Sequence, residues 1–256
     1  MPESAPPRRR QHVWIVLPAY NEEASLPPLL DRIEETLFDS GLEGRVVLVD
    51  DGSQDRTGEI ASAYAHRLAM VHLTHEVNQG LGATIRDGLT KACELAEPED
   101  VIVSLDADNS HPPELIPRVV SRVREGNDVV VASRYQPGSA IRGVPFLRRL
   151  MSFGAGLLFR LIYPVPGVRD YTCGYRGYRA RILQQALAEE GERFFDQDGF
   201  QCMVDILLKL SRRPLVFGEV PLVLRYDLKG GVSKMRVAQT VRKTLTLLVR
   251  RRFGLP

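Results

Sequence analysis

Two aspartates on either side of Ala107, Asp106 and Asp108, are the side chains of this 256-residue chain best suited to chemistry. They follow the apolar run VIVSL at 101–105, which is typical of a strand buried in a sheet. Two carboxylates without an adjoining cysteine offer hard oxygen ligands, which suit Mg²⁺ or Mn²⁺ rather than zinc. A metal ion with so few protein ligands keeps positions for substrate phosphates and can stabilise a leaving diphosphate. The alternative interpretation of such a pair is a turn or a helix cap.

Three further polar clusters stand where predicted strands end: PAYNE at 18–22, VDDGS at 49–53 and SRY at 133–135. Each of them alone is typical of a turn. In a doubly wound sheet, however, ligands bind at the carboxyl ends of the strands, so four such clusters together indicate a binding site. Asp50 and Asp51 are suited to accept hydrogen bonds from a base or a ribose. The chain has neither a GxGxxG motif after the first strand nor a P-loop, which argues against dinucleotide-binding and P-loop proteins.

The elements that must position these clusters alternate regularly over the first half of the chain. Apolar β-rich runs predict strands at 12–17, 45–49, 70–74, 101–105 and 129–132, and helical spacing predicts helices at 22–38, 55–68, 81–96 and 112–124. This alternation is typical of βαβ units. Beyond residue 133 helices are expected to dominate. We therefore predict an α/β, Rossmann-like domain with a mostly parallel central sheet, helices on both faces and a helical C-terminal extension.

The net charge of +2 conceals an uneven distribution. Residues 225–256 contain nine Lys or Arg and one acid, which gives +8, whereas residues 1–224 contain 25 bases and 31 acids, which gives −6. A basic tail on an acidic body is typical of a protein that contacts a polyanion, and a solvated helix face is the alternative interpretation. Because only Tyr226 and Phe253 supply aromatic rings in the tail, nucleic acid is not expected as the partner.

Two amphipathic segments favour a membrane surface instead. Residues 150–163 are apolar apart from Ser152 and Arg160 but too short to span a bilayer, so we expect them in its interface or, as the alternative, in the core. Residues 237–252 combine an apolar stripe with basic side chains, and packing on the domain is again the alternative. The stripe is Val237, Val241, Leu245 and Leu248, and the expected membrane contacts are Arg242, Lys243, Arg250, Arg251 and Arg252.

The compartment is predicted from what the sequence lacks. The N-terminal residues have no apolar signal segment, and no uninterrupted apolar run approaches 20 residues. Three scattered cysteines, Cys93, Cys173 and Cys202, do not form a disulfide or zinc pattern and suit a reducing compartment. We therefore expect a cytoplasmic protein bound peripherally to a membrane.

Five motifs together resemble the family 2 glycosyltransferases: LPAYNEEASLPPLL, VVLVDDGSQDRT, NQGLGATIRDGL, VIVSLDADNSHPPELIP and VVVASRY. Two others, RDYTCGYRGYRARIL and GVSK at 231–234, resemble its dolichol-phosphate (polyprenyl-phosphate) mannosyltransferase branch. The likeness runs from about residue 12 to about residue 240. It implies a nucleotide-sugar-binding domain that transfers a sugar with inversion, assisted by Mg²⁺ or Mn²⁺. For this branch it implies GDP-mannose as donor and a polyprenyl phosphate as acceptor at the cytoplasmic membrane face.

The resemblance also assigns roles to residues of the matching motifs. It implies nucleotide contacts for Pro18, Tyr20, Glu22, Val49 and Asp51, metal and diphosphate contacts for Asp106, Ala107 and Asp108, and phosphate contacts for Arg134, Arg225 and Lys234. Asp106, Asp108 and Arg134 would be the catalytic residues, with Asp106 and Asp108 as the metal ligands. Ser110 stands where several relatives carry a metal-binding glutamine, and it could ligate the metal or cap the helix after Pro112. We expect a flexible segment at 1–11, a glycosyltransferase domain at 12–235 and a basic amphipathic helix at 236–256.

The acceptor decides whether a general base is needed. A hydroxyl acceptor must lose its proton to a base, whereas a phosphate acceptor is already an anion. Asp196 and Asp198 are candidates for such a base, but we favour the interpretation that they cap a helix at 199–210. The alternatives are a UDP-sugar donor, a carbohydrate hydroxyl acceptor, or a non-catalytic nucleotide-sugar-binding membrane protein. The sequence leaves open whether a separate membrane subunit assists.

Overall fold

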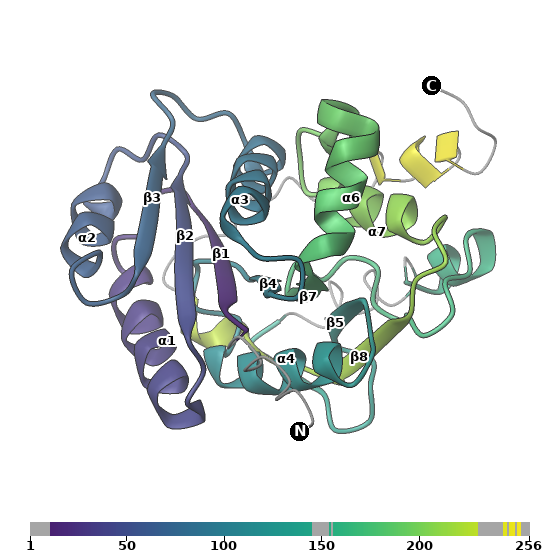
Figure 1. The fold of residues 1–256 in the computed structure, drawn as a ribbon, viewed down its shortest axis with the longest axis horizontal. Helices are drawn as coiled ribbons and strands as arrows, with labels where there is room; N and C mark the ends of the chain where they lie inside the picture. The colour runs from purple at the N-terminus through teal and green to yellow at the C-terminus, as the bar shows by residue number, and fades with distance from the viewer. Residues whose placement is uncertain are drawn as a thin grey trace, which may run out of the picture.

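The central element of the fold is a seven-stranded sheet in the order β3-β2-β1-β4-β7-β5-β8 (Figure 1). The structure, a computed structural model, describes residues 11–144, 154, 156–229, 243, 244, 246–248, 250 and 251. Neighbouring strands are parallel except β7, which is antiparallel to both β4 and β5. The strands are β1 (Val13–Ala19), β2 (Gly44–Asp50), β3 (Met70–Thr74), β4 (Val101–Ser104), β5 (Val129–Ser133), β7 (Arg176–Arg179) and β8 (Phe217–Pro221). The predicted α/β class with a mostly parallel sheet is confirmed.

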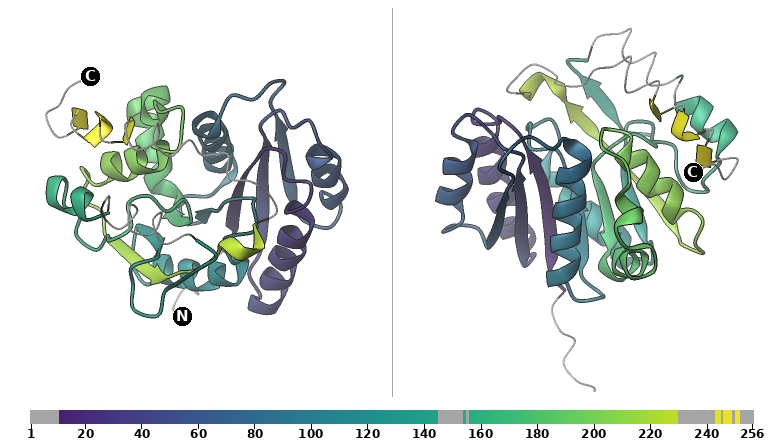
Figure 2. Two further views of the ribbon diagram at one scale, coloured as in Figure 1. Left: turned by 180° about the vertical axis from the view of Figure 1, so that it is seen from behind. Right: turned by 90° about the horizontal axis from the view of Figure 1, so that it is seen from above.

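Helices cover both faces of this sheet (Figures 1 and 2). Side chains of α1 (Leu26–Ser40), α2 (Thr57–Tyr64) and α4 (Ile116–Arg124) pack with Ile15 and Leu17 on one face. Side chains of α3 (Leu81–Leu95) and α6 (Ala180–Glu190) pack with Trp14 and Val16 on the other. The helix α7 (Cys202–Leu210) contributes to both clusters. Short 3₁₀ helices are η1 (Pro113–Leu115), η2 (Gly191–Phe195) and η3 (Tyr226–Leu228).

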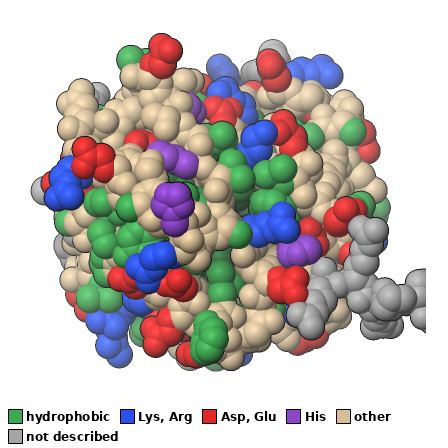
Figure 3. Space-filling view, turned by 60° about the vertical axis from the view of Figure 1, so that its left-hand side comes forward, with side chains coloured by type: hydrophobic (Ala, Val, Ile, Leu, Met, Phe, Trp, Pro, Cys, Tyr) green, Lys and Arg blue, Asp and Glu red, His purple; other side chains and the backbone are tan. Residues whose placement is uncertain are grey.

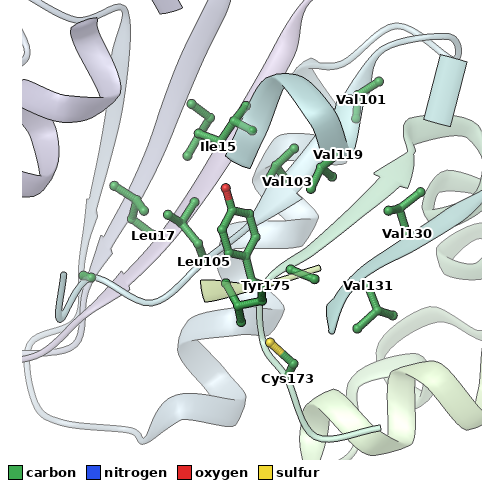
Figure 4. Close-up of a cluster of buried hydrophobic side chains, with 14 of the residues drawn as sticks. Ile15, Leu17, Val101, Val103, Leu105, Val119, Val130, Val131, Cys173 and Tyr175 are labelled. Carbon is green, nitrogen blue, oxygen red and sulfur yellow. The ribbon is translucent and has the colours of Figure 1, made fainter. Parts of the chain in front are cut away.

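Apolar periodicity explains why these elements form. Along β1 alternate side chains enter opposite clusters, as expected for a strand covered on both faces. The apolar stripe of α1 consists of residues spaced three or four apart, and all of them are buried: Leu26, Leu29, Leu30, Ile33 and Leu37. Figure 4 shows the adjoining part of the core, where side chains of β1 and β4 surround Tyr175.

The chain after residue 133 is less helical than the sequence suggests. The strands β7 and β8 complete the central sheet, and β6 (Ala140–Arg142) pairs in parallel with β9 (Val223–Arg225) in a second, two-stranded sheet. The expectation that helices dominate this half is therefore wrong in part. The prediction that the first strand ends before Pro18 is also wrong, because Pro18 and Ala19 continue β1 in register with Val49 and Asp50.

The outer surface of α1 and α2 carries charges of both signs. Arg67 forms an ion pair with Asp31 at 3.1 Å and another with Glu34. Figure 3 shows the face that includes these helices, where acidic and basic side chains are interspersed. Such a surface is typical of a solvated helix face. Within the described residues, no helix combines the length and the apolar character needed to cross a bilayer.

Candidate active site

The loop after β4 contains Asp106 and Asp108 and is called the acidic loop. It holds Asp108 in a network of hydrogen bonds. The backbone N–H and the hydroxyl of Ser110 donate to Asp108 Oδ1 at 3.0 and 2.6 Å, and the ammonium of Lys229 contacts Oδ2. Asn109 adopts a left-handed conformation at φ 62°, which turns the loop tightly between them. Burial alone would raise the pKa of Asp108, but the charge of Lys229 and the hydrogen bonds from Lys229 and Ser110 hold it below its ordinary value. Asp108 is therefore an anion at neutral pH.

Asp106 is the more open of the two carboxylates. Its side chain is 44% exposed, and the ring of His111 approaches Oδ2 at 3.8 Å. The Asp106 backbone N–H donates to His111 Nδ1 at 3.1 Å, so this ring nitrogen is an acceptor there rather than a metal ligand. Lys229 contacts Asp108 in the same loop, and the Asp106 carboxylate lies beside Gly174, in the segment that also contains Asp170 and Thr172.

The donor set of this loop fits a hard divalent cation that shares its ligands with a substrate. Among the described residues, no group of three or more His, Cys, Asp or Glu side chains could hold a metal ion. Mg²⁺ typically binds through one or two carboxylates, waters and substrate phosphates, so Asp106 and Asp108 suffice for such a site. The Ser110 hydroxyl bonds to Asp108 and does not cap a helix, since the N-cap of η1 is Pro112. The helix-cap interpretation of Ser110 is therefore wrong.

Arg134, at the end of β5, is fixed by a buried carboxylate. Its Nε and Nη2 donate to the two oxygens of Asp170, both at 2.7 Å, and Nη2 also donates to Thr172 Oγ1 at 2.6 Å. Burial disfavours both charges, but each charge stabilises the other, so the pKa of Asp170 is lowered and that of Arg134 is raised. Glu219 on β8 holds this segment, because it accepts from the N–H groups of Arg169 and Asp170 at 2.5 and 2.8 Å. The pair stays ionised at neutral pH, and Asp170 and Thr172 fix the orientation of the guanidinium.

The loops after β1 and β2, which contain the predicted nucleotide contacts and are called the nucleotide loops for that reason, are joined by hydrogen bonds. The Asn21 N–H donates to Ser53 Oγ at 2.9 Å, and the Glu22 N–H donates to Thr57 Oγ1 at 2.8 Å. These contacts place the segment of Pro18, Tyr20 and Glu22 beside that of Asp51 at one sheet edge, as the sequence predicts. The side chain of Val49 is buried in the core, so a nucleotide contact from this residue would come from its backbone.

Asp51 is buried and anchors the loop that leads into α3. It accepts from the backbone N–H groups of Gln79 and Gly80 at 2.8 and 2.9 Å and contacts His75 Nδ1 at 2.7 Å. The other ring nitrogen of His75 contacts Asp87 at 2.9 Å. His75 is not among the residues that the sequence motifs single out. The structure shows that it bridges two carboxylates behind the predicted nucleotide loop.

Arg225 is joined to the acidic loop by a hydrogen bond of its backbone. Its N–H donates to the Ser110 carbonyl at 2.9 Å, while its guanidinium bonds to Asp227 at 2.9–3.2 Å. The structure therefore brings Arg225, Asp106 and Asp108 to one place, together with Lys229, which the sequence analysis did not single out. Lys234, predicted as the partner of Arg225, lies outside the described residues.

The profile of glycosyl transferase family 2 matches residues 14–187, which contain both nucleotide loops, the acidic loop and Arg134. The chain belongs to this family. It is therefore a glycosyltransferase, and the resemblance seen in its sequence motifs is confirmed.

Relatives of this glycosyltransferase share about a third of its residues. A dolichol-phosphate mannosyltransferase of Pyrococcus furiosus is 31% identical over 85% of this chain, which spans 58% of that protein's length. An undecaprenyl-phosphate mannosyltransferase of Micrococcus luteus is 33% identical over 87% of each chain. An undecaprenyl-phosphate 4-deoxy-4-formamido-L-arabinose transferase of Pseudomonas aeruginosa is 39% identical over 69% of this chain and 49% of that one.

The fold is shared with more distant glycosyltransferases. The crystal structure of glucosyl-3-phosphoglycerate synthase from Mycobacterium tuberculosis in complex with Mg²⁺ and uridine diphosphate matches with a TM-score of 0.66. The match covers 96% of this chain and 80% of that one at 21% sequence identity. At this identity the likeness shows a common fold.

The predicted helix caps of the glycosyltransferase, Asp196 and Asp198, have other contacts. The helix α7 begins at Cys202, and its N-cap is Gln201, so the capping interpretation is wrong. Asp196 pairs with Lys209 at 3.0 Å and with Arg251 at 2.8 Å. Burial opposes its charge, but these hydrogen bonds hold the pKa of Asp196 far below its ordinary value. The carbonyl of Asp198, whose side chain is exposed, accepts from the Gly82 N–H at 3.0 Å.

The described part of the C-terminal segment packs on the domain. Leu247 and Leu248 are buried in the core, and Arg251 donates to both oxygens of the buried Asp205 at 2.7 and 3.0 Å. The prediction that Arg251 contacts a membrane is therefore wrong, because its guanidinium pairs with Asp205 and Asp196 of the same chain. Lys243 and Arg250 are exposed. The other predicted stripe and contact residues lie outside the described residues: Val237, Val241, Leu245, Arg242 and Arg252.

The described part of the apolar segment before β7 has a buried side and an exposed side. In the helix at 156–162, Phe159 is buried in the core, whereas Leu157 and Leu161 are exposed. Phe159 and Leu248 belong to the same buried cluster. The core interpretation therefore holds for one side of this helix, and the other side leaves apolar side chains at the surface, whereas contact with a membrane interface stays a prediction.

Proposed function

We propose that this glycosyltransferase transfers a hexose, with inversion, from a nucleotide diphosphate sugar to a polyprenyl phosphate, with GDP-mannose as the donor. The names of the relatives support the acceptor more strongly than the sugar. All three name dolichol phosphate or undecaprenyl phosphate, whereas two name mannose and one names a formamido-arabinose. Mannose is proposed because its transferases match this chain over the greater length.

The observation that carries the proposal is the set of cations around the two aspartates. Lys229 contacts Asp108, the Arg225 backbone bonds to the Ser110 carbonyl, and Arg134 is held by Asp170 and Thr172, in the segment that lies beside Asp106. A donor diphosphate and an acceptor phosphate are both anions, so a site that joins them must offset several negative charges. A carbohydrate hydroxyl would not need so many cations. The charge of the site therefore favours a phosphate acceptor.

The state of the candidate bases points the same way. A phosphate oxygen is already a nucleophile, whereas a hydroxyl needs a base within hydrogen-bond reach. Asp196 is held as an anion by Lys209 and Arg251, and its lowered pKa makes it a weak proton acceptor. Asp198 is exposed beside the N-terminus of α3 and would be the base if the acceptor were a hydroxyl.

Under this proposal, different residues of the chain would bind the metal, the donor and the acceptor. Asp106 and Asp108 would hold Mg²⁺ or Mn²⁺, which offsets the charge that develops on the leaving diphosphate. Arg134, whose Nε and Nη2 are held by Asp170, would bind a donor phosphate oxygen through the other guanidinium nitrogen, Nη1. The loops that contain Tyr20 and Asp51 would hold the nucleotide, and Arg225 with Lys234 would hold the acceptor phosphate.

We place this reaction at the cytoplasmic face of a membrane, because a polyprenyl phosphate keeps its chain in the bilayer. Leu157 and Leu161 are exposed on one helix, and Lys243 and Arg250 are exposed on the C-terminal segment. Apolar side chains that enter the interface and basic side chains near anionic headgroups are the usual means of peripheral attachment.

The proposal is tested by supplying donors and acceptors in parallel. The full chain is incubated with Mn²⁺, a panel of GDP- and UDP-sugars, and either a polyprenyl phosphate or a carbohydrate acceptor, and products are identified by mass spectrometry. We expect a mannosylated lipid phosphate from GDP-mannose, and none with Asp108→Asn. Product on the carbohydrate would refute the acceptor, and product from a UDP-sugar alone would refute the donor.

A further inference from the structure

Lys229 reaches the acidic loop because the segment from Arg225 to Lys229 is hydrogen-bonded to that loop. The backbone of Arg225 bonds to the Ser110 carbonyl at 2.9 Å, and η3 follows directly. The Lys229 ammonium then contacts Asp108 Oδ2 and lies 5.5 Å from the Tyr226 ring centre. The side chains of Lys229 and Asp108 are only 16% and 11% exposed, so little solvent screens their charges.

This contact occupies the oxygen that a metal ion would need. Asp108 Oδ1 already accepts two hydrogen bonds from Ser110, and Oδ2 accepts from Lys229. A divalent cation that ligates Asp108 must therefore displace the ammonium or share an oxygen with it. Sharing would place a charge of +2 beside a charge of +1 in a half-buried site, which is strongly unfavourable. Asp106 has no such competitor among the described residues.

We propose that Lys229 is a positioning residue that competes with the divalent cation for Asp108, and that a nucleoside diphosphate relieves this competition. The inference rests on the proposed metal site at Asp106 and Asp108. When the metal arrives alone, the ammonium loses its carboxylate and gains nothing. When a diphosphate arrives too, its oxygens offer the displaced ammonium a new anionic partner. Metal and donor therefore bind with positive coupling, so that the metal enters with the diphosphate rather than ahead of it.

Linkage makes the coupling measurable without catalysis. If the diphosphate increases the affinity for the metal by some factor, the metal must increase the affinity for the diphosphate by the same factor. A half-buried ion pair that must be broken weakens metal binding by on the order of tenfold. Removal of the ammonium should tighten binding of the metal alone by that factor and reduce the coupling by a similar factor.

The experiment measures free Mn²⁺ by electron paramagnetic resonance during titration of the full chain, with and without GDP. Lys229→Met should bind Mn²⁺ alone about tenfold more tightly than wild type, and GDP should then improve its affinity much less. Lys229→Arg keeps the charge and should resemble wild type. Lys91→Met is the matched control, because it removes an ammonium from an exposed pair with Glu94 on α3, and it should stay within about twofold.

The outcomes separate the inference from the proposed function. If Asp106→Asn abolishes Mn²⁺ binding but Lys229→Met leaves affinity and coupling unchanged, the metal site stands and the role of Lys229 is refuted. If Asp106→Asn and Asp108→Asn bind Mn²⁺ as wild type does, the metal site itself is refuted, and the inference with it. Circular dichroism of each variant confirms that the fold is retained.

Discussion

Asp170→Asn tests whether the arginine of the site depends on a buried charge. The substitution keeps the size of a side chain that accepts five hydrogen bonds and removes its negative charge. The donors are the backbone N–H of Arg134, its Nε and Nη2, and the backbone N–H groups of Thr172 and Cys173. An asparagine has one acceptor oxygen and would turn an NH₂ group toward some of these donors. The Arg134 guanidinium would then be a buried charge without its counter-ion.

The loss of stability can be worked out from the burial of the pair. Removal of one partner of a buried ion pair costs about 3–5 kcal/mol of folding free energy. Asp170 is 1% exposed but Arg134 is 17% exposed, so water can partly solvate the remaining charge and the lower end, about 3 kcal/mol, applies. In a domain of this size each kcal/mol lowers Tm by about 2–4 °C, so we expect a decrease of about 6–12 °C.

The dependence on pH has a definite sign. Burial would raise the pKa of Asp170, but Arg134 holds it below the ordinary value of 3.8. A carboxyl whose pKa is lower in the folded state stabilises the protein above its unfolded pKa and loses this contribution as the pH falls through the folded one. The stability difference between wild type and Asp170→Asn should therefore be full at pH 7 and shrink below about pH 3.8.

The assay is thermal unfolding followed by circular dichroism from pH 3 to 8. The matched control is Glu59→Gln, which removes an exposed carboxylate that pairs with Arg56 at 3.4 Å and should change Tm by less than about 2 °C. A Tm for Asp170→Asn within that same range, or a difference from wild type that does not shrink in acid, would refute the reasoning.

Three further predictions concern activity and membrane binding. Asp108→Asn should lower kcat by more than about 100-fold while circular dichroism shows that the fold is retained; normal turnover in EDTA would contradict its role as a metal ligand. Asp198→Asn should retain kcat within about threefold, whereas Arg134→Ala should lose more than about 100-fold; the reverse order in steady-state kinetics would favour a hydroxyl acceptor. Lys243→Ser with Arg250→Ser should weaken co-sedimentation with anionic vesicles but not with neutral ones, because each basic residue contributes about 1 kcal/mol at such a surface; unchanged binding would exclude these residues as contacts.

The first half of the fold is predictable from the sequence because its signals are local. The strands β2, β4 and β5 are almost continuous runs of buried apolar residues, and the stripe of α1 has helical spacing. Strand ends then indicate where the site must lie. The acidic loop, Arg134 and both nucleotide loops do lie along this edge, as the sequence predicts.

The strand β7 is not predictable in this way, because its stability depends on distant contacts. Its sequence, RGYR, is too polar for a buried strand. Arg176 is nevertheless fully buried, since its guanidinium donates to the carbonyls of Tyr171, Cys173 and Met203. Gly177 is also required, because a Cβ there would collide with Val119 of α4. Apolar periodicity contains neither piece of information.

The partners of the site residues are missed for a similar reason. Asp170 is 36 residues from Arg134, and Lys229 is 121 residues from Asp108. The sequence shows that both belong to charged or motif-rich segments, but the pairing depends on how two loops meet across the sheet edge. For the same reason Arg251 cannot be distinguished in the sequence from the other basic residues of the tail. In the structure its guanidinium bonds to Asp205 and Asp196.

The cations of the site differ in how readily they can exchange a carboxylate for a phosphate. Arg134 is bound through two hydrogen bonds to a fully buried partner, so its release would cost several kcal/mol and it must act in place. Arg225 and Asp227 are about one-third exposed, and such a pair contributes at most about 1 kcal/mol, so an incoming phosphate can readily replace Asp227. Lys229 and Asp108 are intermediate in exposure. Under the proposed function, the fixed guanidinium would bind the donor, and the exchangeable cations would become available when the substrates bring their own negative charge.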